Sequence, residues 1–137
     1  MARKPSAIVL DSWAIMSYLG NEPSAERVAD IMADANEEDV PLFMTVVNAG
    51  EVGYILAREV SVVEADSSIR QLRQLGIRFV DADWDLAHEA AGFKSRHKMS
   101  FADCFAAALA KQKKAHLITG DKEFNQVKAE ISITWLS

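Results

Sequence analysis

The chain has 137 residues, of which 50% are hydrophobic and 26% are charged, the balance of an ordinary soluble globular protein. Its length favours one domain with room for a hydrophobic core, and we expect that domain to span residues 1–137. The net charge of −5 argues against a protein that holds nucleic acid by bulk positive potential. It does not exclude a metal-dependent nuclease, because clustered carboxylates lower the net charge.

The single cysteine, Cys104, allows no internal disulfide, so a reducing compartment is the simple interpretation. The start of the chain does not resemble a signal peptide. No apolar stretch approaches the ~20 residues that a membrane-spanning helix needs. We therefore expect a cytoplasmic protein without membrane contact.

The first half of the chain alternates short apolar runs with helix-like stretches. Ile8–Leu10 is an apolar run that ends in a carboxylate, Asp11, which is typical of a buried strand in a parallel sheet. In chain order we predict a strand at Ile8–Leu10, a helix over Ser12–Leu19, a helix from Ser24 to about Ala35, a loop over Asn36–Asp39, a strand at Leu42–Met44 and a helix that begins at Thr45 or Asn48.

The second half continues this alternation. In chain order we predict a helix over Val62–Leu75 that stops at Gly76, a strand at Ile77–Val80, a helix capped within Asp81–Asp83 that ends in a basic run at Lys94–Lys98, a helix from Phe101 to about Gln112, a strand at Leu117–Thr119 and an edge strand at Ile131–Trp135. This order indicates a three-layer α/β/α fold with a mainly parallel central sheet flanked by helices. Sites in such sheets lie outside the carboxyl ends of the strands, so Asp11 and Asp121 are expected at one edge.

All four candidate acids also have ordinary structural explanations; for Asp103 it is that Ser100-Phe101-Ala102-Asp103 fits a capping pattern. Asp11 follows a strand, and an acid in that position is often only the N-cap of the next helix. Glu51 follows Asn48 by three residues, which matches a capping box. The apolar neighbours of Glu51, Val47 and Val52, favour instead a carboxylate that points inward. Both interpretations of Glu51 stay open.

Asp103 is the most informative acid in the sequence. Its helix continues with Cys104, Phe105 and a run of alanines, so it is apolar nearly all round and is predicted to be buried. A buried acid is costly unless it is paired or bound to a cation. Asp121 lies in a Gly-Asp turn, which is also a common cap. Glu123 is either a further acid of the site or a solvent-facing residue of a short helix.

Carboxylates that converge on one sheet edge repel one another and raise each other's pKa values. A divalent cation relieves this repulsion, and hard oxygen ligands without histidine or cysteine suit Mg²⁺ or Mn²⁺. Ser12 directly follows Asp11, and Thr119 lies two residues before Asp121. Their hydroxyl groups could orient carboxylates or water molecules. The basic runs at residues 94–98 and 111–114 are the best local candidates for phosphate contacts, although a solvated face is their default explanation.

Four segments together resemble the acidic motifs of PIN domains. They are Ile8-Val9-Leu10-Asp11-Ser12, Asn48-Ala49-Gly50-Glu51-Val52, Ser100-Phe101-Ala102-Asp103-Cys104 and Leu117-Ile118-Thr119-Gly120-Asp121-Lys122-Glu123-Phe124. Their order and their near end-to-end coverage of the chain are most similar to the VapC-type toxins of bacterial and archaeal toxin–antitoxin pairs. Trp13 departs from the pattern, because a small or polar residue is expected after Asp-Ser.

The resemblance implies a Mg²⁺- or Mn²⁺-dependent endoribonuclease, the toxin of a type II pair, which cleaves RNA phosphodiester bonds with a metal-activated water. It also implies a homodimer and a cognate antitoxin. The residues that it assigns to metal binding and catalysis are Asp11, Glu51, Asp103 and Asp121, with Ser12, Ser100 and Thr119 in support.

Two other classes of protein stay open from the sequence. A PIN-like scaffold that binds RNA or protein without cutting has no need of four mutually repelling acids. A receiver-like signalling module also places acids and Mg²⁺ at strand ends. It needs a phospho-accepting Asp after a middle strand, which Asp81 offers, and a Lys after a late strand, but no Lys directly follows the fourth predicted strand.

Overall fold

The computed structural model describes residues 5–136, so residues 1–4 and 137 of the expected domain lie outside the described part of the chain. The strands are β1 (Ile8–Leu10), β2 (Leu42–Thr45), β3 (Ile77–Val80), β4 (His116–Thr119) and β5 (Ser132–Trp135). The helices are α1 (Ser12–Leu19), α2 (Ala25–Glu37), α3 (Val46–Glu59), α4 (Val62–Gln74), α5 (Trp84–Arg96) and α6 (Phe101–Lys113), with a 3₁₀ helix, η1 (Lys122–Val127). Within residues 5–136, none of the helices combines the length and the apolar character needed to cross a membrane.

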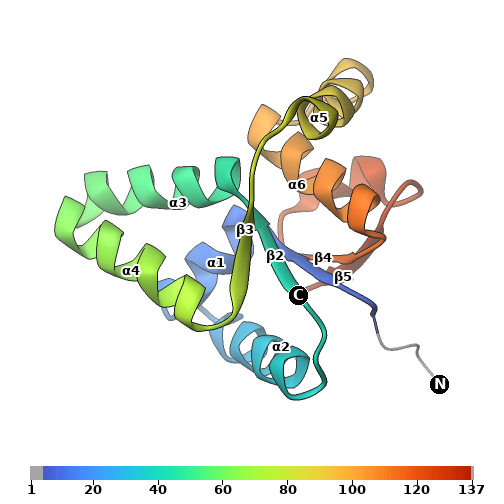
Figure 1. The fold of residues 1–137 in the computed structure, drawn as a ribbon. Helices are drawn as coiled ribbons and strands as arrows, with labels where there is room; N and C mark the ends of the chain where they lie inside the picture. Colours follow the sequence, from blue (N-terminus) through green and yellow to red (C-terminus); the bar gives the residue numbers. More distant parts are fainter. Residues whose placement is uncertain (1–4, 137) are drawn as a thin grey trace.

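The strands form one sheet in the order β3-β2-β1-β4-β5, and each neighbouring pair is parallel. β1 is the central strand: Ile8 is paired with Leu42 of β2 on one side and with His116 of β4 on the other. Helices cover both faces of the sheet (Figure 1). The predicted three-layer α/β/α fold is therefore confirmed, with a sheet that is parallel throughout.

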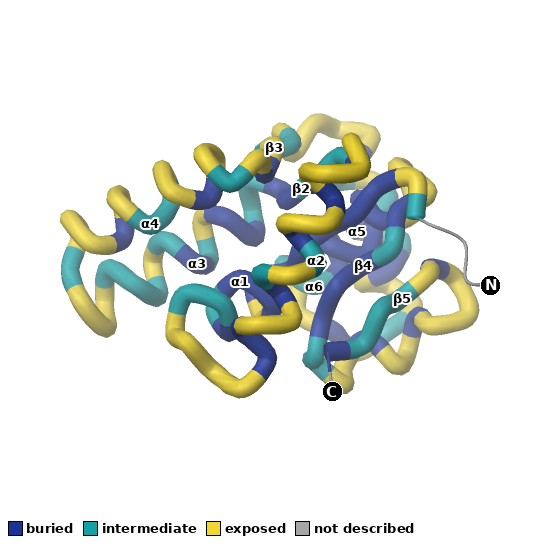
Figure 2. Tube along the Cα trace, turned by 90° about the horizontal axis from the view of Figure 1, so that it is seen from below, coloured by how far each residue is buried: buried dark blue, intermediate teal, exposed yellow. Residues whose placement is uncertain are grey.

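Successive residues of β1 point to opposite faces of the sheet, as the two-residue period of a strand requires. Val9 packs into a core shared with α5 and α6, whereas Ile8 and Leu10 pack into a second core that includes residues of α1 to α4. Figure 1 shows α5 and α6 on one side of the sheet and α1 to α4 on the other. Figure 2 shows β2 and β4 buried between helices whose outer faces are exposed.

The connections of the sheet reverse direction beside β1. The chain first moves from β1 to β2 and β3 on one side, and later returns to the other side of β1 as β4. The carboxyl ends of β1 and β4 therefore flank a topological switch point, where open α/β sheets form a crevice. Asp11 directly follows β1, and Asp121 lies just beyond the end of β4.

Two predicted boundaries need correction. Helix α2 continues to Glu37, so the predicted loop over Asn36–Asp39 begins two residues too early. Helix α3 begins at Val46, and its N-cap is Thr45, whose hydroxyl oxygen accepts a hydrogen bond from the backbone N–H of Asn48. Of the two predicted starts, Thr45 is therefore the correct one, whereas Asn48 lies inside the helix, which excludes the capping-box interpretation of Glu51.

Candidate active site

Asp11 lies at the centre of the site and is almost completely buried, with a relative exposure of 1%. Its Oδ1 accepts a hydrogen bond from the backbone N–H of Ala14 at 2.8 Å, so Asp11 is the N-cap of α1. Its Oδ2 accepts a hydrogen bond from the hydroxyl of Thr119, at the end of the neighbouring strand. Both carboxylate oxygens therefore have a donor, which fixes the orientation of this side chain.

The pKa of Asp11 is raised from 3.8 to about 7. Burial is the largest cause, because it disfavours the charged carboxylate. The hydrogen bonds from Thr119 and Ala14 act in the opposite direction, and the charges of Asp103 and Asp121 add to the rise. Asp11 is thus both a helix cap and a member of a group of interacting acids, so the two explanations of this residue hold together.

Asp103 approaches the same site from the first turn of α6. Ser100 is the N-cap of that helix, and its hydroxyl oxygen accepts a hydrogen bond from the backbone N–H of Asp103 at 3.1 Å. Partial burial and the charge of Asp121 are the main causes that raise the pKa of Asp103 from 3.8 to about 6. The hydroxyl of Ser100 lowers this pKa, and the charges of Glu51 and Glu123 raise it further.

Asp121 is held at the end of β4 by two local hydrogen bonds. Its backbone N–H donates to the Thr119 hydroxyl oxygen at 3.0 Å. Its Oδ1 accepts from the backbone N–H of Glu123 at 2.9 Å, which makes Asp121 the N-cap of η1. Thr119 therefore contacts two acids at once, since it donates to Asp11 and accepts from Asp121.

An open pocket of about 360 Å³ contains most of the predicted site residues at the carboxyl edge of the sheet. It is lined by Ser12, Trp13, Met16, Glu51, Ile55, Ser100, Asp103 and Asp121. Asp11 and Thr119 are buried and do not line it. The structure thus brings Glu51, Asp103 and Asp121 to one pocket, and Asp11 interacts electrostatically with two of them from the protein interior.

Asn48 connects the parts of this site, although the sequence marks it only as a possible helix start. Its side chain is fully buried. Its Nδ2 donates to the Ser12 hydroxyl oxygen at 3.3 Å and to the backbone carbonyl of Ala102 at 3.1 Å, while its Oδ1 accepts from the Thr45 hydroxyl. One amide group therefore joins the starts of α1, α3 and α6. The signal that could have revealed it is a polar side chain inside the apolar stretch around Val46 and Val47.

Glu123 does not line the acidic pocket. It is exposed in η1, and its carboxylate accepts a hydrogen bond from the Gln126 side chain at 3.2 Å. This agrees with the solvent-facing alternative, although its charge still raises the pKa of Asp103.

The two basic runs lie at opposite ends of α6. Residues 94–98 precede α6 and lie near its first turn, whereas residues 111–114 lie at its C-terminal end. The helical rise places Lys111 roughly 12 Å from Asp103 along the axis, and Lys111 forms an ion pair with Glu89 at 2.7 Å. The first run lies nearer to the acids, and within it Arg96 and His97 contact Glu130 at 2.9 and 2.8 Å, which leaves Lys98 as the better candidate for contacts to a ligand.

The donor atoms of this site suit a hard divalent cation, because the polar groups at the pocket are carboxylates and hydroxyls. Burial is the largest cause of the raised pKa values of Asp11 and Asp103, and the charges of neighbouring acids add to it; a cation would relieve both effects by stabilising the carboxylates. Within residues 5–136, however, no group of three or more His, Cys, Asp or Glu side chains is arranged to hold a metal ion. The chemistry of the site fits a cation, whereas the side chains as they lie do not enclose one.

Comparison with known proteins agrees with this architecture. The PIN domain family matches residues 8–130, which is most of the chain. The protein therefore belongs to the PIN domain family. No curated protein gives a significant match.

Several solved structures share the fold over nearly their whole length. VapBC2 from Rickettsia felis, bound to a DNA fragment of its promoter, has a TM-score of 0.72 and 12% identity over 93% of this chain and 97% of that chain. VapC20 from Mycobacterium tuberculosis, a toxin that cleaves the sarcin–ricin loop, has a TM-score of 0.69 and 19% identity over 91% and 96%. FitAcB from Neisseria gonorrhoeae has a TM-score of 0.70 and 23% identity over 94% and 97%. At these identities the likeness establishes the fold.

The family and the sheet order exclude the receiver-like alternative. That class needs its phospho-accepting Asp after a middle strand, but Asp81 follows β3, which is an edge strand of the sheet. The acids that interact follow β1 and β4, or begin α6. This arrangement is the one that the PIN resemblance predicted.

Proposed function

We propose that the protein is a Mg²⁺- or Mn²⁺-dependent endoribonuclease and the toxin of a type II toxin–antitoxin pair. The observation that carries this proposal is the group formed by Asp11, Asp103 and Asp121, which interact with one another beside an open pocket at the switch point of a PIN fold. A group of three repelling carboxylates is costly for folding, so a ligand that removes the repulsion is the simplest explanation.

The residues of the site have different roles, which depend on whether they are buried or line the pocket. Asp11 supplies a buried carboxylate whose orientation is fixed by Thr119 and Ala14. Asp103 and Asp121 stand at the open pocket, where they can reach a ligand. Trp13, Met16 and Ile55 add an apolar wall to the pocket, which limits the access of water to one side of it.

The acids that would hold the metal are Asp11, Glu51, Asp103 and Asp121, with Ser12, Ser100 and Thr119 orienting them. A bound ion would act as a Lewis acid, which activates water and stabilises charge on the leaving oxygen. Because the pKa values of Asp11 and Asp103 lie at about 7 and about 6, each of these carboxyls holds a proton over part of the neutral range when no cation is present. Cation binding therefore requires proton release, and its affinity should rise with pH.

The relatives support a protein partner as part of the proposal. A structurally similar Klebsiella pneumoniae assembly is described as a toxin–antitoxin complex, and VapBC-5 from Mycobacterium tuberculosis as a member of a family of toxin–antitoxin systems. We propose a cognate antitoxin for this chain, together with a homodimer and a cytoplasmic location. Co-expression with the neighbouring reading frame, followed by purification through a tag on one chain only, tests the antitoxin.

The function itself is tested with Asp103→Asn, which removes one charge from the pocket while keeping the size of the side chain. We expect the wild-type protein to cleave single-stranded RNA with Mg²⁺ or Mn²⁺ and the variant to lose cleavage by at least a hundredfold with little change in thermal stability. Asp66→Asn is the matched control, because Asp66 is exposed on α4. Full cleavage by Asp103→Asn, or by wild type in excess EDTA, contradicts the proposal.

A PIN module that binds RNA or protein without cutting is the second candidate. It is favoured by the absence, within residues 5–136, of a side-chain group arranged around a metal ion. Titration of Mn²⁺ by calorimetry separates the two candidates. The nuclease binds Mn²⁺ in the wild type and loses that binding in Asp103→Asn, whereas the non-cleaving module shows no such difference.

A further inference from the structure

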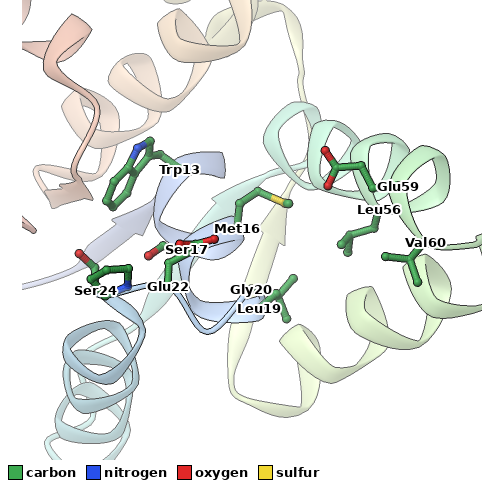
Figure 3. Close-up of a pocket in the computed structure, with 11 residues that line it drawn as sticks. Trp13, Met16, Ser17, Leu19, Gly20, Glu22, Ser24, Leu56, Glu59 and Val60 are labelled. Atoms are coloured by element: carbon green, nitrogen blue, oxygen red, sulfur yellow. The ribbon is translucent and has the colours of Figure 1, made fainter.

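Trp13 occupies the boundary between two cavities. It lines the acidic pocket, and with Met16 it also lines a pocket of about 660 Å³ between α1 and α3. Figure 3 shows its ring on the side of α1 away from Leu56 of α3 and from Val60, which follows that helix. Trp13 is 37% exposed, although it lies only two residues after the buried Asp11.

The position of the Trp13 ring depends on Gly120. A Cβ atom at residue 120 would lie 2.3 Å from Cη2, 2.5 Å from Cζ3 and 2.7 Å from Cζ2 of Trp13. The far end of the six-membered ring therefore lies directly against the backbone of Gly120, in the space that any other residue would fill. Because Gly120 immediately precedes Asp121, this contact places the aromatic ring next to one of the acids.

A ring held in this way is suited to stacking. Single-stranded nucleic acids bind by stacking their bases on aromatic side chains, and the contact tolerates different bases because each has a π-face. A side chain that is already fixed by packing loses less conformational freedom when a base stacks on it. The pocket that contains Trp13 also contains Asp103 and Asp121, so a phosphate brought to the acids carries its nucleobase within reach of the indole.

We infer that the Trp13 indole is the stacking platform for a nucleobase of single-stranded RNA whose adjacent phosphate lies at the acidic pocket, an inference that rests on the proposed function. Trp13 is in this view a binding residue that selects unpaired RNA. A base within a duplex is already stacked and has no free face to offer. The same arrangement explains why the chain departs from the family pattern at this position without losing the acids.

The inference is tested first by RNA affinity in excess EDTA, where the proposed nuclease does not cut bound RNA. The probe is a single-stranded RNA of about ten nucleotides, which fits the usual range of site sizes, and a set of copies with one abasic position moved along the strand. We expect Trp13→Ala to weaken binding by roughly 5- to 150-fold and Trp13→Phe to retain most of the affinity. At one abasic position, wild type and Trp13→Ala should bind equally.

Fluorescence supplies a readout that does not depend on cleavage. The chain has three tryptophans, and stacking on RNA should quench the emission of Trp13. Quenching should disappear in Trp13→Phe and persist in Trp84→Phe, the matched control, because Trp84 is 72% exposed on α5 and does not line the acidic pocket. Equal quenching in both variants overturns the inference.

Gly120→Ala provides a second variant that leaves Trp13 in the chain. The added Cβ must displace the ring, so RNA affinity should fall as it does in Trp13→Ala. Gly53→Ala is its control, since a Cβ there meets only Ile69 at 4.0 Å. A Gly120→Ala protein that folds and binds RNA with unchanged affinity contradicts the inference.

The outcomes separate this inference from the proposed function. RNA cleavage by the wild type, with unchanged binding and cleavage in Trp13→Ala, overturns the stacking role only and assigns Trp13 to the wall of the larger pocket. RNA-dependent quenching of Trp13 without cleavage under any divalent cation supports the stacking role and overturns the nuclease. A wild-type protein that binds no RNA overturns both.

Discussion

Thr119 donates a hydrogen bond to Oδ2 of Asp11 and thereby joins the carboxyl ends of the adjacent strands β4 and β1. Both residues are buried, with relative exposures of 0% and 1%. The bond lowers the pKa of Asp11 against the larger effect of burial. The hydroxyl of Thr119 therefore stabilises the charged form of an acid that the protein interior would otherwise keep protonated.

Thr119→Val should destabilise the protein more at high pH than at low pH. Valine has a similar shape but no donor, so the charged form of Asp11 loses a buried hydrogen-bond partner, at a cost of about 1–3 kcal/mol. Below the pKa of Asp11 the carboxyl is protonated and the loss is smaller. Urea denaturation of both proteins at pH 5 and pH 8 measures the difference. Thr134→Val is the control, because that hydroxyl has only a 3.5 Å contact with His116.

Asp11 should make the metal-free protein less stable as the pH rises. Below pH 3.8 its carboxyl is protonated in both the folded and the unfolded chain. As the pH rises from 3.8 to about 7, the unfolded chain releases its proton while the folded chain retains it, so the free energy of unfolding falls. The total fall is on the order of a few kcal/mol, and it ends above pH 7. Denaturant titrations in EDTA across this range measure it.

Asp11→Asn isolates this contribution. An Asn side chain can still accept the hydrogen bond from Ala14 through its oxygen, so the helix cap is kept. We expect a flatter pH profile, a stability at pH 8 equal to or above that of the wild type, and loss of RNA cleavage. Asp66→Asn should leave the profile as it is. An unchanged profile in Asp11→Asn would show that Asp11 is not the acid responsible.

Asn48→Ala should weaken both folding and activity. It removes the hydrogen bonds to Ser12, Thr45 and Ala102 and leaves buried partners unsatisfied, which we expect to lower the free energy of unfolding by about 2–4 kcal/mol. Loss of such orienting contacts at a metal site typically reduces activity by about 10- to 100-fold. Cleavage measured well below the unfolding temperature separates the second effect from the first.

Asn36→Ala is the matched control for Asn48→Ala. Asn36 is exposed at the end of α2, and its side-chain amide donates one hydrogen bond, to the Leu75 carbonyl at 2.8 Å. Its replacement should reduce the stability by about 1 kcal/mol and leave cleavage unchanged. Equal losses of cleavage in both variants would contradict a role of Asn48 in orienting the residues of the site.

Lys98 and Lys122 should contribute to RNA affinity through the phosphate backbone. Lys98 precedes the first turn of α6, and Lys122 directly follows Asp121. Their joint replacement by Ala should weaken RNA binding and reduce the slope of log affinity against log salt by about 0.7 for each lost phosphate contact. Lys113→Ala with Lys128→Ala changes the net charge equally at the opposite end of α6, so it should have little effect on that slope.

Much of the fold was predictable because its causes are local. The apolar run Ile8–Leu10 predicted strand β1. Gly76 predicted the end of the preceding helix, because glycine tolerates the positive φ that it adopts there, 94°. The acids could be assigned to one edge because parallel strands end at the same side of a sheet. The order of the strands, β3-β2-β1-β4-β5, was not predicted, because the alternation of strands and helices does not determine which strands are neighbours.

Other features depend on contacts between distant residues, which local patterns do not contain. The role of Asn48 arises from partners 36 and 54 residues away. The contact between the Trp13 ring and Gly120 requires β1 and β4 to be neighbours. From the sequence alone, Trp13 is only a departure from the motif pattern of PIN domains. The start of α3 was ambiguous because Thr45 and Asn48 are both good caps, and the end of β2 decides between them.

The bond between Thr119 and Asp11 closes a loop of 108 residues, which has a consequence for how the protein is made. A chain emerging from the ribosome presents Asp11 long before Asp121. Until β4 has emerged and taken its place beside β1, the buried acid lacks its partner and the acidic pocket lacks a wall. A nascent or truncated chain that lacks β4 therefore cannot form the assembled site.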